Sequence, residues 1–171
     1  MKKIILFLAL AMLAFHSYAQ DESGGATSKG SWLIEVNTNS STTGNTGFSL
    51  ASVDGNTAWS AGAEAGYAVI DDLFVKVGLG YADFGGDIES SFLYKIGAKY
   101  YVSEQIPVGV DFTGASSDGN NANWVGLQAG YAWFISDNIA IEPTLRYNLT
   151  LDELKADSIF QGLIGFSIFL D

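Results

Sequence analysis

The sequence predicts an all-β protein: an eight-stranded antiparallel up-and-down transmembrane β-barrel, preceded by a cleaved signal peptide. The main observation is that apolar and polar side chains alternate with period two along most of the chain. A second observation is the composition, because only 16% of the residues are charged while 48% are hydrophobic and 13% aromatic. Soluble domains carry roughly 25% charged residues. The length of 171 residues suits a single domain.

The first residues have the features of a secretory signal peptide. Lys2 and Lys3 precede twelve apolar residues, 4–15, and the small residues Ser17 and Ala19 follow. We expect cleavage after Ala19. The alternative, an anchoring transmembrane helix, needs about 20 apolar residues, so this run is too short. The chain therefore divides into a signal peptide (1–19), a short N-terminal segment (20–29) and the barrel (30–171).

Alternating segments separated by turn residues predict the individual strands. Turns of two or three residues recur on one side, at 71–72, 103–105 and 136–138. The other connections, mostly longer, are residues 40–56, 85–88, 116–122 and 152–157. This alternation predicts an antiparallel meander whose tight turns share one end, facing the periplasm, with strands of membrane-spanning length. The eight strands are expected at residues 30–39, 57–70, 73–84, 89–102, 106–115, 123–135, 139–151 and 158–170.

An internal repeat agrees with that strand count. At an offset of 64 residues, segments 54–68 and 118–132 share nine identical positions. Four strands with their connections fill such an offset, so we interpret the repeat as a duplicated half. The alternative is that Gly-Tyr pairs recur by chance in a barrel of this kind.

The two faces of the predicted strands differ in chemistry. One phase is apolar, as in Val75, Val77 and Leu79, and aromatic residues collect near the strand ends. Apolar outer walls with aromatic girdles are typical of membrane barrels. A soluble, lipocalin-like barrel is the alternative, and it would turn its polar face to water instead.

The opposite phase holds four acids and four bases. A Lys or Arg at the centre of the lipid face costs about 2–4 kcal/mol, so these side chains are expected to point inward. The interior of an eight-stranded barrel is only just wide enough for side chains to fill it. We therefore predict a structural network of ion pairs that plugs the lumen, with a proton or ion path as the alternative. Its residues are Glu35, Glu64, Lys76, Lys95, Lys99, Asp111, Glu142 and Arg146.

Two residues do not fit the simple pattern. Pro143 falls in the middle of a strand, where its missing N–H interrupts the hydrogen-bond ladder, so we expect a bulge there. Trp124 falls in the lumen phase unless its strand changes register near the outer end.

With these features the chain resembles the small outer-membrane β-barrels of the OmpA/OmpX type across residues 30–171. The final strand keeps the alternation of such barrels through Ile164, Phe166, Ile168 and Leu170, but the chain ends in Asp171 where they usually end in an aromatic residue. The resemblance implies location in the outer membrane of a Gram-negative cell. It also implies contacts with outer-membrane lipid and lipopolysaccharide, and with the barrel assembly machinery.

The residues favour a non-enzymatic protein without cofactor or metal. The chain has no cysteine, and its single histidine, His16, lies in the predicted signal peptide. The usual general base and thiolate nucleophile are therefore missing. A net charge of −11 also argues against nucleic-acid binding. We expect a role in envelope structure or surface interaction and adhesion through the outer loops. The alternative is a narrow porin-like conduit for ions or small apolar solutes, as in barrels resembling OmpW.

Overall fold

The computed structural model describes residues 25–38, 46–53, 56–86, 89–117 and 120–171. The predicted signal peptide lies outside the described residues. No helix among them is long and apolar enough to cross a membrane. The strands are β1 (Trp32–Asn37), β2 (Ser49–Val53), β3 (Asn56–Ile70), β4 (Leu73–Asp83), β5 (Ser91–Val102), β6 (Ile106–Ser117), β7 (Asn120–Gly130), β8 (Trp133–Ser136), β9 (Ile139–Thr150) and β10 (Ile159–Leu170).

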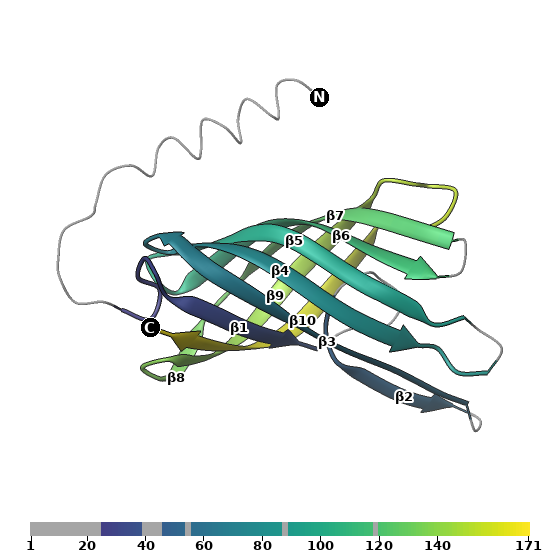
Figure 1. Ribbon diagram of the computed structural model, residues 1–171, viewed down its shortest axis with the longest axis horizontal. Coiled ribbons are helices and arrows are strands. Elements are labelled where there is room, and N and C mark those ends of the chain that lie inside the picture. The colour runs from purple at the N-terminus through teal and green to yellow at the C-terminus, as the bar shows by residue number, and fades with distance from the viewer. Residues whose placement is uncertain (1–24, 39–45, 54–55, 87–88, 118–119) are drawn as a thin grey trace, which may run out of the picture.

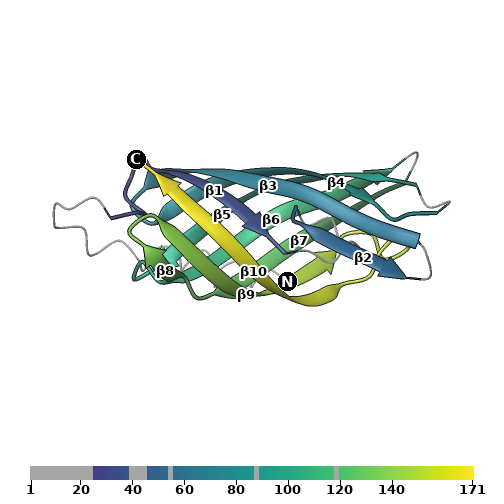
Figure 2. The same cartoon turned by 90° about the horizontal axis from the view of Figure 1, so that it is seen from below.

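The strands form a closed antiparallel barrel. Hydrogen-bonded neighbours follow the order β1-β10-β9-β7-β6-β5-β4-β3, and β1 also pairs with β3, which closes the circle. Because β7 and β8 both pair with β9 along one line, the barrel has eight strand positions among the described residues. The tight turns and the C-terminus lie at one end, and β2 lies toward the other (Figures 1 and 2).

Strand β2 is absent from the sequence prediction, which assigned residues 40–56 to a connection. It pairs with the N-terminal half of β3, from Ser49↔Ser60 to Val53↔Asn56. Strand β1 pairs with the C-terminal half of β3, nearer the tight turn. The first strand position is thus split between β1 and β2. The Ser, Thr, Asn and Gly residues around β2 are typical of loops, which is why periodicity did not reveal a strand of five residues.

The predicted faces agree with the structure. Val77 and Leu79 on β4 are 54% and 62% exposed on the outer wall, while Lys76, which directly precedes Val77, is only 4% exposed. At the tight-turn end, the exposed rings of Trp32 and Tyr67 meet with centroids 5.1 Å apart. The outer wall is therefore apolar, and the interior at the level of Lys76 is charged.

The bulge predicted at Pro143 is wrong. Strands β9 and β10 stay in register through the pair Pro143↔Ile164. The effect of the proline falls on the other neighbour, where Tyr131 N–H donates to the Pro143 carbonyl at 3.1 Å and receives no N–H in return. Because Pro143 has no N–H to donate, the ladder is interrupted between β7 and β8. The pairing with β9 keeps the same register before and after the interruption, at Gly130↔Thr144 and Trp133↔Ile141.

Trp124 occupies the lumen without a change of register. Its side chain is 3% exposed, and its indole N–H donates to the Asp157 carbonyl at 3.1 Å. The hydrogen bond anchors the connection between β9 and β10 over the outer end of the interior.

Candidate functional site: the barrel interior

The eight predicted lumen charges all lie inside the barrel. None is more than 8% exposed, and they come from six strands: β1, β3, β4, β5, β6 and β9. We call them the charged layer: Glu35, Glu64, Lys76, Lys95, Lys99, Asp111, Glu142 and Arg146.

Two glutamates each bridge two lysines. The Glu64 carboxylate lies 2.5 Å from Lys95 Nζ and 2.8 Å from Lys76 Nζ. The Glu35 carboxylate lies 2.7 Å from Lys76 and 2.6 Å from Lys99. Because Glu35 and Glu64 are direct cross-strand partners, their like charges would repel without the Lys76 ammonium between them. The lysine therefore holds β1 and β3 together at this level.

The chain of ion pairs ends on a tyrosine. Lys99 also pairs with Glu142, and the Tyr101 hydroxyl donates to the Glu142 carboxylate at 2.8 Å. The Lys99 ammonium also lies 5.2 Å from the centre of the Tyr101 ring, within the range of a cation–π contact. Buried ions keep their charge only when paired in this way.

Arg146 forms a second, bidentate pair. Its two terminal nitrogens each lie 2.6 Å from a different oxygen of Asp111. Its Nε donates to Asn148 at 2.7 Å, and Nη1 also donates to Gln128 at 3.0 Å. A Cβ at position 126 would lie 2.0 Å from the guanidinium, so Gly126 is required to make room for it.

In addition to Gln128, four residues outside the predicted set contact the charged layer. Asn37 donates to Glu35 at 2.8 Å, and Asn148 and Tyr101 bond to Arg146 and Glu142 as described above. All three lie two positions from a predicted charge, so the period-two pattern could have found them. Thr46, the fourth, comes from the connection between β1 and β2 and carried no such signal.

Thr46 enters the lumen from the outer side. It is fully buried, and its hydroxyl donates to Glu64 at 2.7 Å. Added Cβ atoms at Gly62 and Gly78 would lie 3.0 Å from Gly47 N and 2.8 Å from Thr46 Oγ1. These glycines therefore accommodate the entering segment, in addition to long charged side chains as at Gly126.

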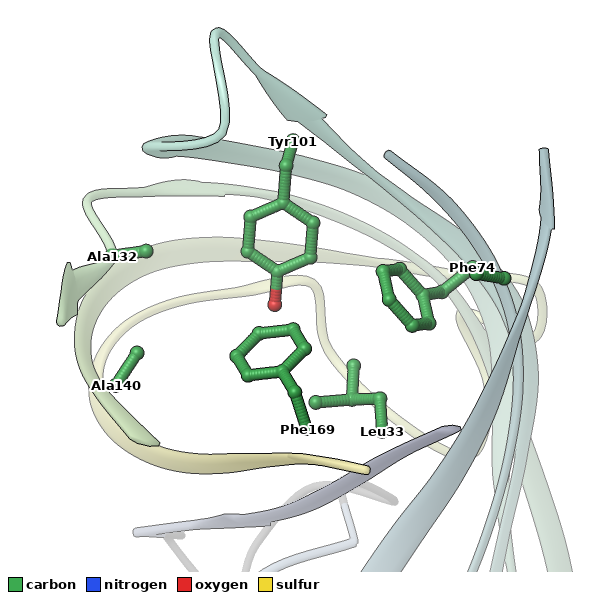
Figure 3. Packing of buried hydrophobic residues seen from close by; sticks show 7 residues of the cluster. Leu33, Phe74, Tyr101, Ala132, Ala140 and Phe169 are labelled. Carbon is green, nitrogen blue, oxygen red and sulfur yellow. The ribbon is translucent and has the colours of Figure 1, made fainter. Parts of the chain in front are cut away.

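A second layer, apolar and aromatic, fills the interior at the tight-turn end. The Phe169 ring lies 5.9, 5.7 and 5.5 Å from those of Phe74, Tyr101 and Phe134. The buried side chains converge inside the ring of strands (Figure 3). We call these residues the aromatic layer: Leu33, Ala68, Phe74, Tyr101, Ala132, Ala140 and Phe169.

The two layers lie one above the other because successive inward positions are two residues apart. Leu33 on β1 precedes Glu35, and Phe74 on β4 precedes Lys76. A spacing of two residues is about 7 Å along a strand. The strands therefore change from apolar to charged interior side chains within one step.

The N-terminal segment 25–31 covers the tight-turn end. Thr27 donates its hydroxyl to Asp72 at 2.5 Å and accepts the Asp72 N–H at 2.8 Å. Burial raises the pKa of Asp72 above its ordinary 3.8; the Thr27 hydrogen bond opposes this shift, and the carboxylates of Glu104 and Asp71 add to it. The Thr27 segment therefore leaves the Asp72 carboxyl partly buried.

The described residues contain no group of three or more His, Cys, Asp or Glu side chains that could hold a metal ion. The acids of the charged layer are all engaged with bases, as listed above. The arrangement can therefore hold neighbouring strands together.

Comparisons with known proteins identify the fold. No protein-family model matches the sequence, and no curated protein matches it either. Among solved structures, the chain is similar to the N-terminal β-barrel domain of Pseudomonas aeruginosa OprF, with a TM-score of 0.50 and 14% identity. The match covers 83% of this chain and 98% of that domain. At this identity the likeness shows the fold alone, a closed eight-stranded antiparallel barrel.

Proposed function

We propose that the chain is a non-enzymatic outer-membrane barrel with a closed lumen, acting in envelope structure or surface interaction through its outer connections. The observation that supports the proposal is that two successive layers of buried side chains, the charged layer and the aromatic layer, lie inside the barrel. A conduit needs a continuous water-filled path, and an eight-stranded interior has little width to spare.

The apolar outer wall of the barrel supports the proposed membrane location. Its outward side chains are apolar, which would be unfavourable in water over so large an area and suits a bilayer. The fold similarity to an outer-membrane domain supports the same placement. We expect a mature chain that begins at Gln20, fractionates with the outer membrane and migrates differently on gels when it is not boiled. Recovery from the soluble periplasm without such a shift would contradict this placement.

The outer connections carry the chemistry available for surface interaction. Their described residues include Glu89, Glu153 and Asp157, and Asp83 ends β4 beside them. Lys155 forms an ion pair with Asp152 at 3.5 Å. The proposed partners are outer-membrane lipid and lipopolysaccharide around the wall, the barrel assembly machinery during insertion, and a surface ligand at the acidic end.

The test is conductance of the purified barrel in a planar bilayer. We expect no steady channel openings from the wild-type chain, and none from the loop variant Asp152→Ala. Reproducible openings that change with Lys95→Ala or Glu64→Gln, but not with Asp152→Ala, would favour the ion conduit instead. Shortening the connection at residues 41–53 would not test the role of the outer loops alone, because it would remove Thr46 and all of β2, both of which bond to the barrel.

A further inference from the structure

A groove of about 580 Å³ lies on the outer wall, at the end opposite the tight turns. Its floor includes Tyr81 on β4 and Phe92 on β5, which are direct cross-strand partners and are 45% and 49% exposed. The same row of outward side chains continues through Ser116 on β6 and Asn121 on β7. Four adjacent strands thus present two rings, a hydroxyl and an amide side by side.

The rest of the lining is polar and includes one carboxylate. Glu89 and Ser90 lie just before β5, and no Lys or Arg is among the described residues that line the groove. An anionic group such as a phosphate would therefore meet a like charge without a basic partner. A neutral ligand rich in hydroxyls has partners here, because serine and asparagine side chains both donate and accept hydrogen bonds and a carboxylate accepts several.

We propose that this groove binds the saccharide headgroup of a neutral glycolipid in the surrounding leaflet. A sugar ring has an apolar C–H face that packs on an aromatic ring, and an edge of hydroxyls that needs polar partners. The groove offers both within one volume, and that volume lies within the usual range of about 300–1,000 Å³ for small-ligand sites.

The position of the groove selects a lipid rather than a free sugar. Tyr81 follows Leu79 and Val77 on the outward side of β4, so the apolar wall continues directly below the rings. A glycolipid seated here places its sugar on the polar row and its chains along that wall. The inference rests on the proposed function in one respect, because it requires the wall to face a bilayer.

The barrel contains a matched control site. Tyr147 on β9 and Phe160 on β10 are also direct cross-strand partners on the outer wall, 41% and 66% exposed. Neither lines the groove. Loss of these rings removes the same aromatic surface from the wall without changing the proposed site.

The experiment measures glycolipid retained on the full-length mature barrel by native mass spectrometry. The barrel is released from nanodiscs that contain monogalactosyl diacylglycerol and phosphatidylcholine. We expect Tyr81→Leu and Phe92→Leu to lower galactolipid retention by about two- to tenfold each, the effect of one lost ring contact. Tyr147→Leu and Phe160→Leu should leave retention unchanged. The heat-dependent gel shift identifies variants that have folded.

The other outcomes overturn the proposal. Equal losses at both aromatic pairs would show a general lipid belt without a saccharide site. Equal retention of phosphatidylcholine and galactolipid by the wild type would show that the sugar is not recognised. If free lactose binds in the groove while the galactolipid stays bound to the barrel, the galactolipid is retained elsewhere. The groove would then be a site for soluble glycans. A barrel that fails to enter nanodiscs contradicts the proposed function, whereas a membrane-inserted barrel without galactolipid contradicts the groove alone.

Discussion

The charged layer and the aromatic layer occupy the same bore but are held in different ways. Each ion pair of the charged layer depends on named partners at fixed distances, such as Arg146 and Asp111 at 2.6 Å. The aromatic layer depends on ring packing between Phe74, Tyr101 and Phe169, with centroids 5.7–5.9 Å apart. Packing is less directional than a buried ion pair, so the charged layer specifies which strands meet and the aromatic layer fills space.

The largest expected effect tests the dependence of the charged layer on its partners. Arg146→Ala leaves Asp111 buried without its bidentate partner, and such a loss costs about 3–5 kcal/mol. Urea unfolding of the barrel refolded into lipid vesicles measures the change in free energy. Asp152→Ala is the control, because its ion pair with Lys155 is exposed and separated by 3.5 Å. Equal, small effects of the two variants would show a solvated lumen.

A smaller effect tests the contact between the layers. Tyr101→Phe keeps the ring within the aromatic layer but removes the 2.8 Å hydrogen bond to Glu142. Hydrogen bonds to charged groups contribute about 1.5–3 kcal/mol, so the free energy of unfolding should fall by that amount. The same urea experiment measures it. A variant as stable as the wild type would mean that the layers are energetically independent.

The smallest effect lies at the tight-turn end, outside both layers. Because the pKa of Asp72 is raised, the protonated carboxyl is favoured in the folded barrel. Its contribution to stability is complete below pH 3.8 and is lost as the pH rises through the raised value. Asp72→Asn imitates the protonated group, so the wild type should lose stability relative to this variant as the pH rises. A constant difference between pH 3 and pH 7 would contradict the shift.

Much of the charged layer could be predicted because a charged side chain on the lipid face of a membrane barrel is strongly destabilising. A lysine such as Lys95 between apolar neighbours has only one tolerable direction, which fixes the orientation of its whole strand. The same reasoning placed Arg146 and Glu142 inside although it could not choose their partners. Pairing depends on strand register, and single-strand periodicity contains no register information.

The aromatic layer could not be predicted in the same way. The alternation of the final strand leaves Phe169 on the inward phase, but it does not show which rings Phe169 will contact. Thr46 and β2 were missing from the sequence prediction for a different reason. Their positions are set by contacts with Glu64 and β3, far along the chain, and their own residues are typical of a loop.

Closure of the barrel also fixes an order of events in time. The seam between β1 and β10 joins Trp32 to Leu170, so it cannot form until β10 has been synthesised. Glu35 on β1 pairs with Lys76 and Lys99, which lie 41 and 64 residues further along the chain, and β1 reaches their strands through its pairing with β3. Contacts over long sequence separations are slow to form. The pairing of β1 with β10 spans the longest separation of the ring, so we expect it to be the last pairing that forms.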